Sequence, residues 1–211
     1  TLSNDYDDQP LASASGRYGL SQRLTLEAHA EGGAGLLAAG LGAATPLGDV
    51  AVLSASLSGS RFDDRVGTKA TVGIEAQLLG FSLAAQTQRT FGEFRDLAAV
   101  TGDEEARRAG YDFFSSKPLR SLDLVSVGMP VRFTGGNFNV AAVSSELEDG
   151  ERQRIVTASY SQRVLGNVSA YTTGYRDIDN GGVGVFARVS VSLGGGHHMA
   201  LGATPAGKGT G

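Results

Sequence analysis

The sequence predicts an all-β fold, an antiparallel up-and-down transmembrane β-barrel with about twelve strands here, as part of a larger barrel. Three observations carry this prediction. Apolar and polar residues alternate strictly over several segments, tight turns containing glycine alternate with longer polar loops, and no apolar run approaches the ~20 residues that a membrane helix needs. A chain without such a run spans a bilayer only as a closed barrel, because lipid offers the backbone no hydrogen-bonding partners. We expect residues 1–211 to form one barrel domain.

Three segments show the clearest alternation, at residues 23–31, 69–78 and 183–193. Strict alternation over this length indicates strands with one apolar and one wet face, because successive side chains of a strand point to opposite sides. We expect the apolar set to face lipid, with Leu24, Leu26, Ala28, Ala30, Ala70, Val72, Ile74 and Ala76 as its clearest members. We expect the polar set to line the lumen, at Glu27, His29, Glu31, Lys69, Glu75, Gln77 and Arg188.

Nine weaker strands fill the intervals between these three segments. Most are near the ~9–11 residues of a membrane strand, and they bring the expected total to twelve. The segment at 121–130 alternates poorly, and the last segment has the weakest pattern. Their expected ranges are 11–18, 36–45, 50–58, 81–89, 121–130, 137–147, 153–164, 167–177 and 197–203.

The connections between strands alternate in length. Tight turns are expected at 19–22, 46–49, 79–80, 134–136, 165–167 and 194–196, and glycine in them supplies the positive φ that such turns need. Longer polar loops are expected at 31–35, 59–67, 90–120, 148–152 and 177–181. Short turns at one end and long loops at the other are typical of bacterial outer-membrane barrels. We therefore expect the short turns to be periplasmic and the long loops extracellular.

The longest connection, at 90–120, combines five aromatic residues with many charges: Phe91, Phe94, Tyr111, Phe113 and Phe114. Aromatic side chains in a loop usually bury against something. One hypothesis is that this segment folds over the mouth of the barrel or dips into its lumen. The alternative is that the strands extend above the membrane and end in a short unstructured tip.

The sequence does not predict an enzyme or a cofactor. The chain has no cysteine, which excludes thiol catalysis and suits passage through an oxidising periplasm, and nucleophile-elbow and phosphate-loop patterns are absent. His29 lies between two strand-spaced carboxylates, but we interpret it as lining the lumen and expect no metal site. Asp177 and Asp179 are better explained by a turn than by a calcium loop. The net charge of -4 argues against a nucleic-acid partner.

The aromatic content is low for a membrane barrel, at 7% with no Trp, whereas such barrels usually carry aromatic girdles at both interfaces. A thin girdle is expected from residues near strand ends: Tyr18, Phe62, Phe81, Phe133, Phe138 and Tyr175. A soluble β-sandwich binding module is the competing interpretation, in which the charged faces would simply meet solvent.

Several stretches resemble the barrel of fimbrial outer-membrane ushers. Tyr18-Gly19-Leu20 followed by Arg23-Leu24-Thr25-Leu26-Glu27 is similar to a segment of that family. Further similar stretches follow in the same order and spacing, at 47–49 leading into 52–56, at 81–97, at 157–161 and at 175–177 leading into 185–193. The resemblance covers most of the chain, although its motifs are diffuse.

The resemblance implies part of a pore of the chaperone–usher pathway in the bacterial outer membrane, corresponding to the barrel after the plug, without the plug or periplasmic domains. Its implied partners are outer-membrane lipid, pilus subunits and periplasmic chaperone–subunit complexes. No functional residue of the family can be carried over, because the recognition sites belong to the other domains. The chain begins without a signal peptide, so we expect a removed leader or an internal piece of a longer protein. The alternative is a self-contained small barrel, a porin or a surface structural protein.

Overall fold

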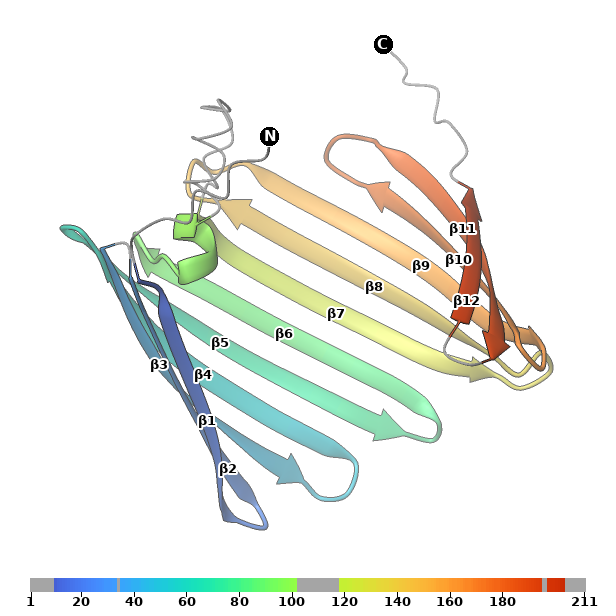
Figure 1. Ribbon diagram of the computed structural model, residues 1–211, viewed down its shortest axis with the longest axis horizontal. Coiled ribbons are helices and arrows are strands. Elements are labelled where there is room, and N and C mark those ends of the chain that lie inside the picture. Colours follow the sequence, from blue (N-terminus) through green and yellow to red (C-terminus); the bar gives the residue numbers. More distant parts are fainter. Residues whose placement is uncertain (1–9, 34, 102–117, 195–196, 204–211) are drawn as a thin grey trace. The chain divides into compact units, whose positions relative to one another are not determined.

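The computed structural model describes residues 10–33, 35–101, 118–194 and 197–203, and for residues 194, 197 and 198 it describes the backbone only. Twelve strands make up nearly all of this part of the chain, coloured in chain order in Figure 1. They are β1 (Ala12–Ser21), β2 (Leu24–Gly33), β3 (Leu36–Leu47), β4 (Ala51–Phe62), β5 (Arg65–Leu78), β6 (Phe81–Gly92), β7 (Leu119–Val131), β8 (Gly136–Leu147), β9 (Arg152–Leu165), β10 (Val168–Asp177), β11 (Val183–Gly194) and β12 (His197–Ala203).

The strands hydrogen-bond in chain order from β1 to β12 within one sheet. The pairs among β1–β4 and among β8–β12 are all antiparallel. The expected all-β, antiparallel, up-and-down topology is therefore confirmed. Each of the twelve expected strands is present, and the weakest of them, at 197–203, coincides with β12.

Two expectations about the connections are wrong. The expected long loop at 59–67 is a two-residue turn at Asp63 and Asp64, between β4 and β5, and only two residues separate β2 from β3. Strict alternation of short and long connections therefore fails here. The polar residues that suggested a loop belong to strands, because serine and glycine are acceptable on a wet strand face.

A smaller difference concerns Gly19, near the first turn. Gly19 was expected in the turn but lies in β1, where the register shifts between Gly19 and Ser21, and the turn itself is at Gln22 and Arg23. By contrast, the turn expected at Leu79-Gly80 is confirmed. Its two residues have φ values of 53° and 86°, the positive pair that a type I′ hairpin turn requires.

The chain divides into two compact units. Unit 1 comprises Thr1–Gly73, Thr87–Ser121 and Leu147–Gly150, and unit 2 comprises Ile74–Gln86, Leu122–Glu146 and Glu151–Gly211. Unit 1 therefore holds β1–β4 with parts of β5 and β6, and unit 2 holds most of β7 and all or nearly all of β8–β12.

Burial in unit 1 is opposite to that of a water-soluble sheet. In β3, Leu36 and Ala38 are buried, whereas Leu37 and Leu41 between and after them are 68% and 70% exposed. In β4, Ser58 is only 4% exposed while its neighbour Leu57 is 61% exposed. Large apolar side chains are also exposed along β5, β9 and β11. In water such a distribution would be strongly unfavourable, because apolar surface is driven into the interior.

Within the described residues, no helix is both long enough and apolar enough to cross a membrane.

Candidate functional site

The candidate functional site of unit 1 is built on one face of β1–β4, here called the polar face. Residues that pair directly across strands project to the same side of a sheet. Glu27 pairs with Arg17 on β1 and with Gly42 on β3. His29 pairs with Gly40, and Glu31 pairs with Ala38. The charged residues of β2 therefore face the small residues of β3.

The fourth strand continues this face with four serines at alternate positions. Ser54, Ser56, Ser58 and Ser60 pair with Ala44, Gly42, Gly40 and Ala38 respectively. The His29 Nε2 atom lies 3.4 Å from the Ser58 hydroxyl, and the ring covers Gly40 so closely that a Cβ there would clash with it. The polar face thus has small side chains on β3, hydroxyl groups on β4 and larger polar side chains on β2.

Residues 93–101, which follow β6, fold against the polar face and are here called the folded-in segment. Two glycines permit the close approach. Gly92 has a φ of 66°, and Gly67 on β5 lies so near the segment that a Cβ would sit 1.9 Å from the Phe94 nitrogen. The Glu93 N–H donates to the Val66 carbonyl at 3.1 Å. The backbone of the segment therefore lies directly on β5.

The segment ends in one helical turn, residues 97–101, seen in green beside the strands in Figure 1. Asp96 caps this turn, since its Oδ1 accepts from the Ala99 N–H at 3.0 Å, as expected of an aspartate at a helix N-cap. The turn carries apolar side chains onto β3. Val100 packs with Leu36 and Ala38, with partly buried apolar neighbours Phe62 and Leu97 around them. This is the apolar cluster of unit 1.

Polar contacts fix the same segment at several points. The Glu31 Oε2 atom accepts from the Leu97 N–H at 2.9 Å, and the Ser60 hydroxyl accepts from the Arg95 N–H at 2.8 Å. Lys69 lies 3.7 Å from the Asp96 carboxylate, and its Nζ is 4.5 Å from the centroid of the buried Phe94 ring. Because both charged and apolar contacts hold it, the segment is a built part of the fold and not a solvated loop.

The polar residues expected to line the lumen do not form one cluster in the structure. Glu31 and Lys69 meet at the folded-in segment, Glu27 forms an ion pair with Arg17, and His29 contacts Ser58. Glu75 and Gln77 lie in the part of β5 that belongs to unit 2, and Arg188 on β11 lies in unit 2 as well. Within the described residues, no group of three or more His, Asp or Glu side chains could hold a metal ion.

Two aromatic residues expected in a girdle pack against residues of the neighbouring strand. Phe62 pairs with Leu36 and belongs to the apolar cluster under the folded-in segment. Tyr175 pairs with Gly184 and covers it closely, on the face of β10 that also carries Tyr171 opposite Arg188. Phe62 therefore lies on the face that carries Ser60, and Tyr175 on the face that carries Arg188. The aromatic girdle itself stays a prediction.

The segment expected to fold back, 90–120, is described only in part, since 102–117 lie outside the described residues. The sequence predicted that Phe94 would be buried, but not which residues would contact the folded-in segment. Gly67, Ser60 and Leu36 carried no distinguishing signal. Only the aromatic and charged composition of the loop pointed to this site.

In unit 2, the turn after β10 is rigidly built. The Asp177 carboxylate accepts from the backbone N–H groups of Asp179 and Asn180 and from the side chains of Asn180 and Gln153, at 3.0–3.1 Å. These donors lower the pKa of Asp177 to about 2, with the Asn180 side chain contributing most. The interpretation of this stretch as a turn is confirmed. Arg154 holds the Asp179 carboxylate with two nitrogens and lowers its pKa.

No protein-family model matches the chain, and no curated protein matches it. Among solved structures, the chain is similar to the translocation pore of the P pilus usher PapC, with a TM-score of 0.59, 20% identity and coverage of 92% of this chain. The match covers 41% of that chain, so the protein described here spans well under half of its length. It also matches the KdgM porin, with a TM-score of 0.40 and 7% identity over 93% of this chain and 90% of that one.

The match to the usher structure shows that the antiparallel, up-and-down sheet of this chain also occurs in a β-barrel. The chain has the fold of a stretch of β-barrel wall.

Proposed function

We propose that this chain is a wall segment of an outer-membrane pore in which the apolar face meets lipid and the polar face lines the lumen. The inverted burial of β3 and β4 carries this proposal. Leu37, Leu41 and Leu57 are exposed on one face, whereas Ser58 and Ser60 are buried on the other, where the folded-in segment also covers Leu36. An exposed apolar face of this kind is favourable in contact with lipid. A soluble sandwich would bury the leucines between two sheets.

The pore is proposed to be of usher type and to translocate and assemble pilus subunits, with outer-membrane lipid and chaperone–subunit complexes as partners. Support comes from the usher-like stretches of the sequence and from the fold shared with the PapC pore over 92% of this chain. The mechanism needs no catalysis. A hydroxyl-rich surface of small residues binds no passing subunit strongly, and strand exchange between subunits supplies the driving force.

The folded-in segment gives the proposed pore a constriction. It stands on the polar face of β3–β5, so in a barrel it would occupy the lumen. Its contacts are numerous but individually weak, because half-exposed ion pairs contribute about 0–1 kcal/mol each. Such a segment suits a pore that must be narrow at rest and wide during passage of a folded subunit.

The proposal is tested with the full-length protein purified from membranes in detergent. Chaperone–subunit complexes from a pilus system of the same cell should co-purify with it, and the protein in planar bilayers should open to conductances much larger than those of small porins. A stable, small conductance without any capture of chaperone–subunit complexes would support the self-contained porin instead. Recovery of the protein from the soluble fraction without detergent would contradict both.

A further inference from the structure

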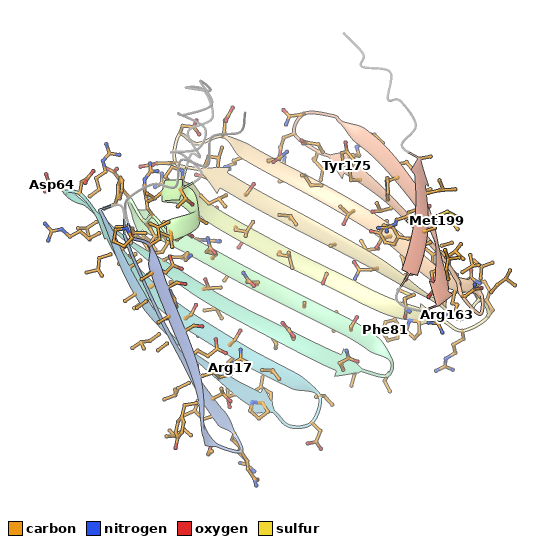
Figure 2. The ribbon with its side chains drawn as sticks, viewed as in Figure 1. Arg17, Asp64, Phe81, Arg163, Tyr175 and Met199 are labelled. Atoms are coloured by element: carbon orange, nitrogen blue, oxygen red, sulfur yellow. The ribbon has the colours of Figure 1, made fainter. Side chains whose placement is uncertain are left out.

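Unit 2 contains a second polar surface, an open cavity of about 750 Å³ on β8–β11 near the turn between β9 and β10. Its lining includes Arg163, Arg188 and Tyr171, together with Asn137, Ser161 and Ser190. Figure 2 labels Arg163 and Tyr175, which lie toward opposite ends of the β9–β10 pair. The cavity is therefore close to the short-turn end of these strands.

Register explains how the two arginines share this cavity. Arg163 pairs with Ser169, which pairs with Ser190, and Ser161 pairs with Tyr171, which pairs with Arg188. The arginines thus stand diagonally across three strands on the same face. Strand spacing and rise place their Cα atoms about 12 Å apart. Two long guanidinium side chains can converge over that distance on one bound group, with Tyr171 between them.

Arg163 and Arg188 differ from the cations of unit 1 that form ion pairs. In unit 1, Arg17 pairs with Glu27, Lys69 with Asp96 and Arg65 with Glu93. Neither Arg163 nor Arg188 has a salt bridge within the described part of the chain. Their cross-strand neighbours in the cavity are serines and a tyrosine. The positive charge of this cavity is therefore left for a ligand.

We infer that this cavity binds carboxylates of an acidic polypeptide segment. Guanidinium groups bind carboxylates through two parallel hydrogen bonds, and the hydroxyl groups of Ser161, Ser190 and Tyr171 can donate to further oxygens. A short peptide with successive carboxylates spans both arginines.

This inference rests on the proposed function, because an acidic stretch of a translocated subunit is the ligand that would reach this face. With the short turns expected to be periplasmic, the short-turn end of these strands is the side on which a subunit would enter. The cavity would hold an arriving acidic segment there before the subunit moves outward. The attraction is between partly exposed charges, so it weakens as ionic strength rises.

The test measures binding of a fluorescently labelled tetraglutamate peptide to the full-length protein in detergent micelles. We expect R163Q and R188Q each to weaken binding about tenfold, the loss of one strong charged hydrogen-bonding partner. The R163K/R188K variant keeps the charge without the paired donors and should bind at an intermediate level. R17Q, which removes a paired arginine in unit 1, is the matched control and should bind as the wild type does.

Three results would overturn the inference: equal binding by R163Q/R188Q and the wild type, equal binding of a tetraglutamine peptide, or displacement of tetraglutamate by the same concentration of inorganic phosphate. The last result would identify a general small-anion site. Binding in micelles needs no transport, so failure here leaves the pore untouched, and failure of the pore assay leaves this binding measurable. Heat-dependent gel mobility of each variant checks that the barrel has folded.

Discussion

Glu31 accepts a hydrogen bond from the backbone N–H of Leu97 at 2.9 Å, across 66 positions of sequence. The carboxylate stands on β2 and the N–H begins the helical turn of the folded-in segment. Loss of the acceptor leaves a part-buried N–H without its partner, which costs about 1–3 kcal/mol. This bond is one of several contacts that hold the proposed constriction on the wall.

Replacing Glu31 with alanine should loosen the folded-in segment and raise the conductance of the full-length protein in planar bilayers. E31Q keeps an oxygen acceptor and should have a smaller effect. E27Q is the control, since Glu27 lies on the same face but pairs with Arg17. Wild-type conductance for a correctly folded E31A protein would show that the segment does not narrow the pore.

Gly67 should be indispensable for the position of the segment. An alanine there would place its Cβ 1.9 Å from the Phe94 nitrogen, so the segment would have to move. We expect G67A to speed hydrogen exchange of the Leu97 and Val100 amides by about tenfold or more, a loss of at least ~1.4 kcal/mol of local stability. At Gly59 a Cβ meets its nearest atom at 3.9 Å, so G59A should leave both amides as protected as in the wild type. Unchanged exchange in G67A would contradict the close packing.

The orientation of β5 predicts unequal costs for arginine at two adjacent positions. Val72 is on the exposed apolar face, and Arg there should destabilise the barrel by ~2–4 kcal/mol if the site lies near the bilayer midplane. Thr71 is on the other face, and T71R should be tolerated. Folding into liposomes, followed by denaturant titration, compares the two. Equal costs would refute the orientation.

The turn after β10 predicts a local pH dependence. The folded-state pKa of Asp177 is about 2, below its unfolded value of ~3.9. Ionised Asp177 therefore stabilises the turn above pH ~4, and that contribution is lost as the pH falls from ~4 toward 2. N180A removes the largest cause and should raise the midpoint toward the ordinary value, whereas N167A, in a different turn, should not. Carboxyl carbon NMR gives the midpoints, and one that N180A leaves unmoved would assign the low pKa to another cause.

Most of the sheet could be predicted from the sequence because one rule, alternation, acts locally along each strand. The strand from Leu24 to Glu31 could be predicted without knowing which strands lie beside it. The folded-in segment could not be predicted in detail, because its partners Glu31, Ser60 and Gly67 lie in three different strands, and nothing local distinguishes them from other wet-face residues. Loop lengths failed at 59–67 for a related reason, since polarity marks a wet face as readily as a loop. The apolar packing of Phe62 likewise could not be predicted, because Val100 of its cluster comes from far along the chain.

The central claim is that one face meets lipid and the other meets water, and cysteine scanning along β2 tests it most directly. Residues 1–211 contain no cysteine, so each variant carries one reporter within them. Single cysteines at residues 26–31 of the full-length protein in liposomes are treated with a water-soluble maleimide and with a lipid-confined one. We predict a period of two, with positions 27, 29 and 31 reacting with the aqueous reagent and positions 26, 28 and 30 with the lipid-confined reagent. Uniform labelling of all six positions by the aqueous reagent, or no labelling of positions 26, 28 and 30 by the lipid-confined reagent, would contradict the membrane wall.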